Sequence, residues 1–320
     1  MTFSSDKEAA DALAAAYQRL RKEIATVIVG QDEVVRLVLT AIFSQGHCLL
    51  VGVPGLAKTL LIQTISDSLD LSFNRVQFTP DLMPSDIVGS ETLTQSREFQ
   101  FVKGPVFANI ILADEINRTP PKTQAALLEA MQEAAVTVAG RRYELPRPFF
   151  VLATQNPIEQ EGTYPLPEAQ LDRFMFNVTL GYPTYADELS IVKATTRGLK
   201  AQAAHVLSAA EIQAFQALVR RVPVADNVIE YAVSLVHKTR PGTERAAPGA
   251  TQYLEWGAGP RASQHLVVGA KANALINGKY SPDIEDVRAV ALPILRHRIV
   301  RNFKAEAEGV TVEKIIQQML

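Results

Sequence analysis

A turn rich in glycine and proline lies between an apolar run and a lysine–threonine pair. After the run Cys48–Val51 the sequence reads Gly52-Val53-Pro54-Gly55-Leu56-Ala57-Lys58-Thr59, and apolar residues then recur at helical spacing. Binding a polyphosphate takes inward-pointing backbone N–H groups, a helix N-terminus, a cation and a hydroxyl that can reach Mg²⁺. The order of strand, turn and helix supplies all of these and predicts a nucleotide phosphate site. A purely structural turn is the alternative, and the residues downstream decide between the two.

Ala57 departs from the usual pattern of such turns, which has glycine at this position. An alanine there must either avoid positive φ or accept backbone strain. The residues predicted to bind the nucleotide phosphates are Gly52, Pro54, Gly55, Leu56, Ala57, Lys58, Thr59 and Leu60.

Two adjacent carboxylates end another apolar run. Asn109–Ala113 is followed by Asp114 and Glu115, which places both carboxylates at the carboxyl end of a parallel strand, where the phosphate turn also opens. Together with the Thr59 hydroxyl, Asp114 is predicted to hold hydrated Mg²⁺, and Glu115 to accept the proton of an attacking water. A solvated strand end is the alternative, which the phosphate turn upstream makes the weaker interpretation. Hydrolysis is therefore favoured over mere binding.

Two further polar residues follow core-like segments. Asn156 comes after Gln155, at the end of the predicted strand that contains the run Phe150–Thr154, and could orient the attacking water, although an Asn-Pro pair also marks ordinary turns. Arg173 stands between Leu171-Asp172 and Phe174, where it needs an anionic partner. That partner is either a carboxylate of this chain or a nucleotide bound by an adjoining subunit, the second case being an arginine finger.

The elements that must position these residues suit an α/β fold. Five short apolar runs alternate with helical stretches in the first half, which predicts a five-stranded, mostly parallel sheet. The predicted strands are 48–53, 75–78, 110–113, 149–154 and 176–180. An amphipathic helix is predicted over 6–26, and alanine-rich helices follow the sheet. These later helices are 185–197, 208–221, 225–239, 261–277 and 283–302. We therefore expect a nucleotide-binding core over residues 1–183 and an all-α domain over 184–320.

Two segments interrupt the predicted core as β-hairpins, 87–103 and 136–145. Between two helices of the second domain, Pro241–Pro260 holds too many glycines and prolines for a regular element. Trp256 lies there and is predicted to be a packing anchor for this loop.

Composition narrows the class of protein. The 320 residues carry a net charge of −2 and a single cysteine. Without a basic run, a nucleic-acid partner is disfavoured; with one cysteine, an internal disulfide is excluded. The sequence has neither a secretory signal nor an apolar run approaching the ~20 residues that span a bilayer. A cytoplasmic protein without membrane insertion is expected.

Taken together, these motifs resemble the AAA+ ATPases, and within them the MoxR group of the helix-2-insert clade. The resemblance covers about Val29 to Leu295. Besides the phosphate turn it includes Thr79-Pro80-Asp81-Leu82-Met83-Pro84-Ser85-Asp86-Ile87-Val88-Gly89, Asp114-Glu115-Ile116-Asn117-Arg118, Gln155-Asn156-Pro157, Leu166-Pro167-Glu168-Ala169-Gln170-Leu171-Asp172-Arg173-Phe174 and Gly259-Pro260-Arg261-Ala262-Ser263. MoxR-like sequences are similar in carrying alanine before the turn lysine.

The resemblance implies a P-loop αβα sandwich with a five-stranded sheet, followed by an all-α lid, and an ATPase that uses ATP and Mg²⁺. It implies a ring, usually a hexamer, in which Arg173 acts on the neighbouring subunit's nucleotide. The segment Val29, Gly30 and Gln31 would then cradle adenine, and Arg261 would be the lid arginine that senses the γ-phosphate, in its own subunit or a neighbour's. An arginine at a helix start opposes the helix dipole, so an anion should compensate Arg261.

The resemblance also implies the positions of other parts. Arg118 resembles an inter-subunit position, and the hairpins resemble the helix-2 insert and the pre-sensor-1 hairpin, with Arg141 and Arg142 expected to contact a client or a neighbour. The expected role is chaperone-like remodelling of a client protein, with a partner that bears a von Willebrand factor A (VWA) domain, and possible metal-cofactor insertion.

Three alternatives remain open at this point. A nucleic-acid motor of the same clade would be stimulated by DNA or RNA. A magnesium-chelatase-like motor subunit would co-purify with a porphyrin-metallating partner. A nucleotide-switched scaffold would bind ATP but hydrolyse it no faster than a Glu115→Gln variant.

Overall fold

The computed structural model describes residues 3–95, 97–157, 162–196 and 202–320. Contacts within the chain divide it into two compact units. The sheet unit comprises Ala16–Leu166 and Val178–Gln213, and the helical unit comprises the residues up to Ala15, Pro167–Asn177 and Ala214–Leu320. The segment that carries Arg173 thus belongs to the helical unit. The domain boundary predicted at residue 183 stays a prediction.

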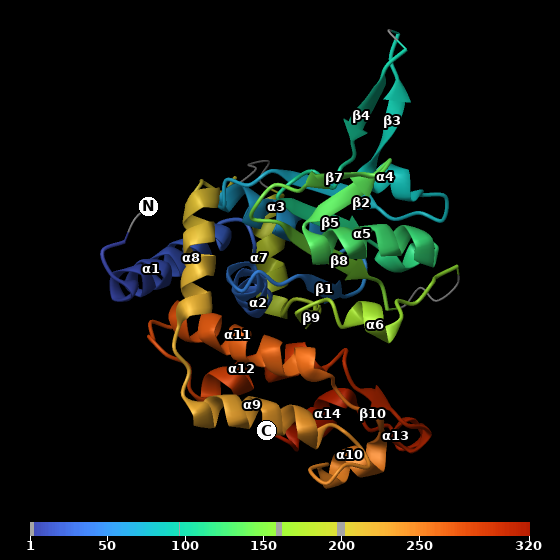
Figure 1. Ribbon diagram of the computed structural model, residues 1–320. Helices are drawn as coiled ribbons and strands as arrows, with labels where there is room; N and C mark the ends of the chain where they lie inside the picture. Colours follow the sequence, from blue (N-terminus) through green and yellow to red (C-terminus); the bar gives the residue numbers. More distant parts are fainter. Residues whose placement is uncertain (1–2, 96, 158–161, 197–201) are drawn as a thin grey trace. The chain divides into compact units, whose positions relative to one another are not determined.

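All five predicted strands form one sheet, in the order β2-β5-β8-β1-β9 (Figure 1). Their bounds are β1 Cys48–Val51, β2 Phe73–Gln77, β5 Ile110–Asp114, β8 Phe150–Gln155 and β9 Phe176–Thr179. The pairs β1–β8, β2–β5 and β5–β8 are parallel. The register places Gln77 of β2 opposite Asp114 of β5. Parallel strands covered on both faces need continuous apolar runs, which β5 and β8 have.

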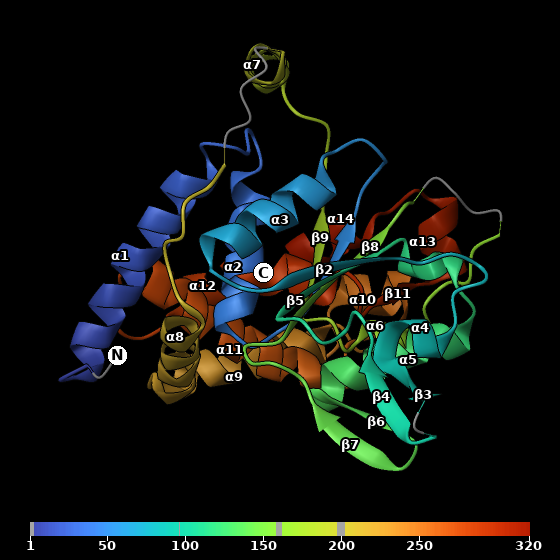
Figure 2. The same cartoon turned by 90° about the horizontal axis from the view of Figure 1, so that it is seen from above.

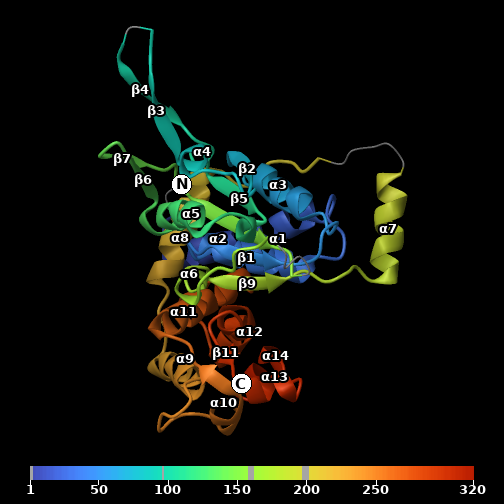
Figure 3. The same ribbon diagram turned by 90° about the vertical axis from the view of Figure 1, so that its right-hand side faces the viewer.

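Helices cover both faces of this sheet. Figures 2 and 3 show α3 (Lys58–Ser68) and α5 (Pro121–Glu133) on opposite sides of it. The αβα layering expected from the sequence is therefore confirmed. The other helical elements before residue 200 are α1 Asp6–Ile24, α2 Asp32–Phe43, α4 Pro84–Val88, η1 Ile116–Arg118, α6 Glu168–Leu171 and α7 Tyr185–Thr195.

Both predicted hairpins are present. The first pairs β3 (Gly89–Leu93) with β4 (Phe99–Lys103), and the second pairs β6 (Ala135–Val138) with β7 (Arg141–Glu144). The rings of Phe101 and Tyr143 are stacked with centroids 4.1 Å apart, so an aromatic contact joins the two hairpins.

The helical unit is built around α9, α11 and α12. Besides α6, its elements after residue 200 are α8 Ala209–Arg221, α9 Asp226–Lys238, α10 Pro248–Tyr253, β10 Leu254–Trp256, α11 Pro260–Ile276, α12 Ile284–Leu295, β11 Val300–Arg301, α13 Phe303–Ala307 and α14 Val312–Gln317. By the division above, α1 and α8 each contribute residues to both units. Small residues allow close packing here: a Cβ at Gly269 of α11 would lie 3.1 Å from Met175 and 3.3 Å from Val290 of α12. The expected helical region after the sheet is thus confirmed, and it also contains the short strands β10 and β11.

The sequence interpretation was wrong at two places in this unit. The last long helix, predicted over 283–302, ends at Leu295, because Val300 and Arg301 pair as β11 with β10. Pro241–Pro260 is not free of regular structure, since it holds α10, with proline in its first turn, and β10. Trp256 is 64% exposed on β10 and is therefore no packing anchor.

Candidate active site

The predicted phosphate turn connects β1 to α3. Gly52 is required at its start, because a Cβ there would lie 2.9 Å from the Leu180 side chain, and Gly55 has a φ of +86°. The Lys58 ammonium donates a hydrogen bond of 2.7 Å to the Gly52 carbonyl, so it lies over the turn itself. Burial lowers the pKa of Lys58, while the nearby carboxylates of Asp114 and Glu115 oppose that shift. The turn therefore presents a cation close to the two carboxylates, as a phosphate–metal site requires.

Ala57, where such turns usually have glycine, adopts a positive φ. It precedes α3 with φ 53° and ψ 30°, in the left-handed region. An L-residue with a Cβ pays about 1–2 kcal/mol for this conformation. The chain thus accepts strain at Ala57 rather than avoiding positive φ, and such strain is characteristic of binding loops.

Asp114 is held at the end of β5 by contacts from both neighbouring strands. Its Oδ2 accepts from Arg75 of β2, at 3.1 Å from Nε and 2.6 Å from Nη2. Its Oδ1 accepts a 2.6 Å hydrogen bond from the Thr154 hydroxyl of β8. Only 13% of the Asp114 side chain is exposed, so this carboxylate is fixed in orientation before any ligand arrives.

Glu115 directly follows and turns away from the strand, with φ 57° in the left-handed region. Its backbone N–H donates to the Thr154 hydroxyl at 2.8 Å. Its Oε2 accepts from Gln77 at 2.9 Å and from Arg118 at 3.1 Å. The backbone reversal gives the two adjacent carboxylates different surroundings, as general-base and metal-binding roles would need.

Three residues of this site were missed by sequence reasoning: Arg75, Gln77 and Thr154. Arg75 and Gln77 lie two residues apart on β2, and the side chains of both contact the carboxyl end of β5. The alternation of polar residues in β2 was a signal for them, but the sequence does not reveal which strand lies beside β5. In the sequence Thr154 is an ordinary strand residue with no sign of a functional role. In the structure its hydroxyl joins Asp114 to Glu115.

Asn156 lies immediately after β8 and is buried, with 6% of its surface exposed. The residue before it is tied to the phosphate turn, because the Gly52 N–H donates to the Gln155 carbonyl at 3.2 Å. The geometry thus brings Asn156, the turn and the carboxylate pair to the same end of the sheet. Its role as the polar group that orients water stays a prediction.

The segment predicted to cradle adenine lies between α1 and α2. Gly30 has a φ of +73°, and a Cβ there would lie 2.7 Å from Cγ of Asp187. Asp187 belongs to the first turn of α7, where its backbone N–H and its carboxylate both contact the Thr184 hydroxyl. Gly30 is therefore required on two grounds, positive φ and close approach. Val29 and Gln31 flank it, and Gln31 directly precedes α2.

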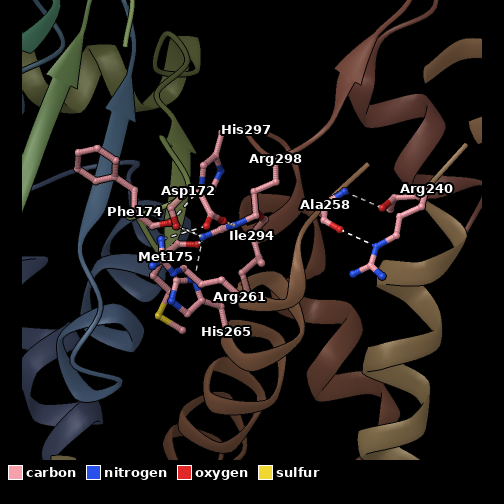
Figure 4. Close-up of polar contacts among 11 residues, drawn as sticks. Asp172, Phe174, Met175, Arg240, Ala258, Arg261, His265, Ile294, His297 and Arg298 are labelled. Carbon is pink, nitrogen blue, oxygen red and sulfur yellow. Dashed lines mark hydrogen bonds and ion pairs between the residues drawn. The ribbon is translucent and has the colours of Figure 1, made fainter. Parts of the chain in front are cut away.

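Arg173 and Arg261 lie in the helical unit, and the carboxylate of Asp172, the residue before Arg173, lies beside Arg261 and Arg298 (Figure 4). Asp172 accepts from Arg261 at 3.0 Å and from Arg298 at 2.8 Å. It is the anion expected to compensate Arg261 at the start of α11. Within the described part of the chain Arg173 forms no ion pair, so the alternative of an Arg173–carboxylate pair finds no support there.

The residues at the sheet suit ATP with Mg²⁺. Magnesium bound to nucleotide takes most of its ligands from phosphates and water and needs only one or two protein oxygens. Thr59, in the first turn of α3, and the oriented carboxylate of Asp114 supply such oxygens. In the described residues no group of three or more His, Cys, Asp or Glu side chains forms a protein-only metal site. Nor does any helix there have the length and apolar character for crossing a membrane.

The chain is similar to known proteins over most of its length. Residues 47–176 match the family model described as the ATPase family associated with various cellular activities, and 247–319 match an AAA lid domain. Chaperone MoxR1 of Mycobacterium tuberculosis is 42% identical over 97% of this chain and 83% of its own length. Protein MoxR of Methylorubrum extorquens is 32% identical over 88% of this chain and 86% of its own. A crystal structure of a candidate ATPase from Cytophaga hutchinsonii shares 42% identity, covers 98% of this chain and 95% of its own, and gives a TM-score of 0.91.

Proposed function

Because the chain belongs to the MoxR family of AAA+ ATPases and is therefore an ATP-hydrolysing enzyme, we propose that it hydrolyses ATP with Glu115 as general base and Asp114 as the Mg²⁺ carboxylate. The observation that carries this proposal is the Thr154 hydroxyl, which donates to Asp114 and accepts from the Glu115 N–H. One side chain thereby joins the Asp114 carboxylate to the Glu115 backbone, while Gln77 and Arg118 bind the Glu115 carboxylate.

In this proposal each residue of the site has its own role in ATP hydrolysis. Lys58 neutralises the outer phosphates, and the N–H groups of the turn and of the first turn of α3 receive phosphate oxygens. Thr59 and Asp114 would hold Mg²⁺, which withdraws charge from the phosphates when it is bound. Asn156 orients the attacking water, and Glu115 takes its proton. Val29, Gly30 and Gln31 would hold the adenine ring.

The assignment of Glu115 is tested by the Glu115→Gln variant. Loss of a general base lowers turnover by typically 10² to 10⁴. ATP affinity should stay within about twofold, because Lys58, Thr59 and Asp114 remain. A Lys58→Ala variant is the matched control and should lose binding itself. Equal, slow hydrolysis by wild type and Glu115→Gln would instead support the nucleotide-switched scaffold.

We further propose a ring, in hexameric form, in which Arg173 completes the site of the adjoining subunit. Support comes from Arg173 itself, which is half-buried and forms no ion pair with the described residues. An arginine that stabilises the transferring phosphoryl group contributes about 10³ to 10⁵ in rate. Arg261 would contact the γ-phosphate from the lid, in its own subunit or a neighbour's.

The work done by this hydrolysis is proposed to be chaperone-like remodelling of a client protein. The Mycobacterium tuberculosis relative is named a chaperone, and we extend that role to this chain. A VWA-domain partner and metal-cofactor insertion are parts of the same proposal. The β3–β4 and β6–β7 hairpins, which the Phe101–Tyr143 stack joins, are the proposed client-contacting parts. Affinity capture with Glu115→Gln should retain the partner and client in the presence of ATP, and capture that does not depend on ATP would contradict this role.

A further inference from the structure

Arg298 is a buried arginine that neither the sequence motifs nor the proposed reaction uses. It follows α12 by three residues, and only 1% of its side chain is exposed. A buried guanidinium is stable only if its donors are satisfied, ideally by an anion as well as by neutral acceptors. Figure 4 shows where those donors point: toward the chain segment Asp172–Met175.

Arg298 donates hydrogen bonds to main-chain carbonyls on both sides of Arg173. Its Nη2 donates to the Asp172 carbonyl at 2.9 Å and to the Phe174 carbonyl at 2.6 Å. Its Nη1 donates to the Met175 carbonyl at 3.2 Å and also to the Ile294 carbonyl of α12. Three carbonyls of one short segment are thus fixed by a single side chain, and Arg173 lies between them.

Charge and neighbours hold Arg298 in this position. Its Nε donates to the Asp172 carboxylate at 2.8 Å, so the same residue offers it both an anion and a carbonyl. His265 Nδ1 lies 2.8 Å from Arg298 Nη2 and must accept, because a guanidinium only donates. Burial lowers the pKa of Arg298 to about 10, which leaves it charged near neutral pH.

His297 forms a further hydrogen bond to the same segment. Its Nε2 lies 3.0 Å from the Phe174 carbonyl and therefore carries the donated hydrogen. Burial and the adjacent Arg298 charge keep the pKa of His297 well below its usual value, so the ring stays neutral. Phe174 thus receives hydrogen bonds from two consecutive residues of the helical unit.

We propose that Arg298 is a positioning residue for Arg173: it clamps the main chain of residues 172–175 so that the Arg173 guanidinium projects at a fixed angle, ready for the neighbouring subunit's phosphates. The proposal rests on the proposed role of Arg173. Only an arginine can do this, because the clamp uses Nε and both terminal nitrogens at once, whereas a lysine presents a single ammonium. The Asp172 carboxylate also binds Arg261, so the clamp joins the lid arginine and the finger in one polar cluster.

The test uses full-length Arg298→Lys, alone and mixed with Glu115→Gln. Misplacing a catalytic group by about 1 Å can cost 10² in rate. Arg298→Lys alone should therefore lose about 10- to 100-fold in kcat at saturating ATP. Its ATP affinity, measured with a fluorescent nucleotide, should stay within twofold. An equimolar mixture should hydrolyse ATP several-fold faster than the sum of the two separate proteins, because Glu115→Gln subunits supply a correctly held Arg173 to intact sites.

Controls separate the clamp from general damage and from the role of Arg173. Arg288→Lys alters another arginine of the helical unit, which contacts Glu285 at 2.6 Å and Tyr231 at 3.0 Å, and it should keep wild-type kcat. Full activity of Arg298→Lys beside an inactive Arg173→Ala would overturn the clamp alone. Full activity of Arg173→Ala would overturn both proposals. A mixture of Arg298→Lys with Glu115→Gln that shows no gain, when Arg173→Ala does gain, would also overturn the clamp.

A second variant covers the case in which Arg298→Lys does not fold. Asp172→Asn removes the charge that holds Arg298 and keeps the Asp172 carbonyl that the clamp also uses. It should show the same loss of kcat and the same gain on mixing with Glu115→Gln. Wild-type kcat in Asp172→Asn, or a loss that mixing does not relieve, would contradict the clamp.

Discussion

Arg75 places two donor nitrogens on a single oxygen of Asp114, at 3.1 and 2.6 Å. The guanidinium therefore occupies one face of the carboxylate that is proposed to hold hydrated Mg²⁺. A fixed positive charge at this point orients the carboxylate, but it also opposes a second cation. Since 46% of the Arg75 side chain is exposed, solvent weakens both effects.

An Arg75→Gln variant tests this competition. Removing the charge should lower the Mg²⁺ concentration needed for half-maximal nucleotide binding by about fivefold, equivalent to ~1 kcal/mol between two charges in a solvent-like dielectric. The measurement is a Mg²⁺ titration of fluorescent-ATP binding, with Arg288→Gln as a control that leaves the site untouched. A higher Mg²⁺ requirement in Arg75→Gln would mean that orientation, not competition, is the main effect of Arg75.

Thr154 should be needed for both stability and turnover. Thr154→Val keeps the shape but leaves Asp114 Oδ1 and the partly buried Glu115 N–H without their shared partner, which costs up to about 1–3 kcal/mol for each unsatisfied group. We expect a lower urea midpoint and a larger fall in kcat than in ATP affinity. Thr154→Ser retains the hydroxyl and should recover most of both. Equal effects of valine and serine would show that the methyl group, not the hydroxyl, matters.

These contacts show what the sequence could and could not reveal. Lys58, Asp114 and Asn156 were found because each lies within a few residues of the end of an apolar run, and such runs are local. Arg75 and Thr154 depend on which strands are neighbours, and that is set by packing across the sheet. Arg298 had no local signal, because an arginine shortly after a helix looks the same whether it is solvated or buried.

The same distinction explains the errors in the helical unit. The apolar pattern of the last long helix continues past Leu295, but pairing of β11 with β10 uses those residues in a strand. Tryptophan in a loop suggested a buried anchor, yet a two-stranded ribbon leaves one face of Trp256 in solvent. In both cases a long-range pairing outweighed a local preference.

Strain at Ala57 predicts opposite effects of two substitutions. Ala57→Gly removes the Cβ penalty at φ 53° and should raise the free energy of unfolding by up to about 1 kcal/mol. Ala57→Val places a β-branched residue in the left-handed region and should destabilise the protein by more than that, with weaker ATP binding. Urea denaturation and nucleotide titration measure the two quantities. An unchanged midpoint in Ala57→Val would argue against a strained turn.

His47 predicts a pH dependence of stability. Its Nε2 donates to the Met131 carbonyl at 3.1 Å, and its Nδ1 accepts from the Val151 N–H at 3.0 Å, so the folded protein needs the neutral ring. Burial lowers the pKa of His47 from 6.5 to about 4. Between these two pH values the His47 ring is protonated in the unfolded chain but neutral in the folded protein. The free energy of unfolding therefore falls as pH drops from 6.5 toward 4.

A comparison with His47→Gln isolates this effect, because glutamine offers a donor and an acceptor but does not titrate in this range. Between pH 7 and 5 the wild-type urea midpoint should fall more steeply than that of His47→Gln. The carboxylates contribute equally to both proteins and cancel in the difference. Parallel pH profiles would exclude His47 as the titrating group.

The central claim is that ATP held by one subunit is hydrolysed with the arginine of the next. Its most direct test is steady-state ATP hydrolysis by an equimolar mixture of Arg173→Ala and Glu115→Gln, each nearly inactive alone. Sites that keep Glu115 and lie beside a subunit that keeps Arg173 are complete, so the mixture should exceed the sum of its parts at least several-fold. An activity equal to that sum, in a mixture shown to contain both variants in one ring, would contradict the account.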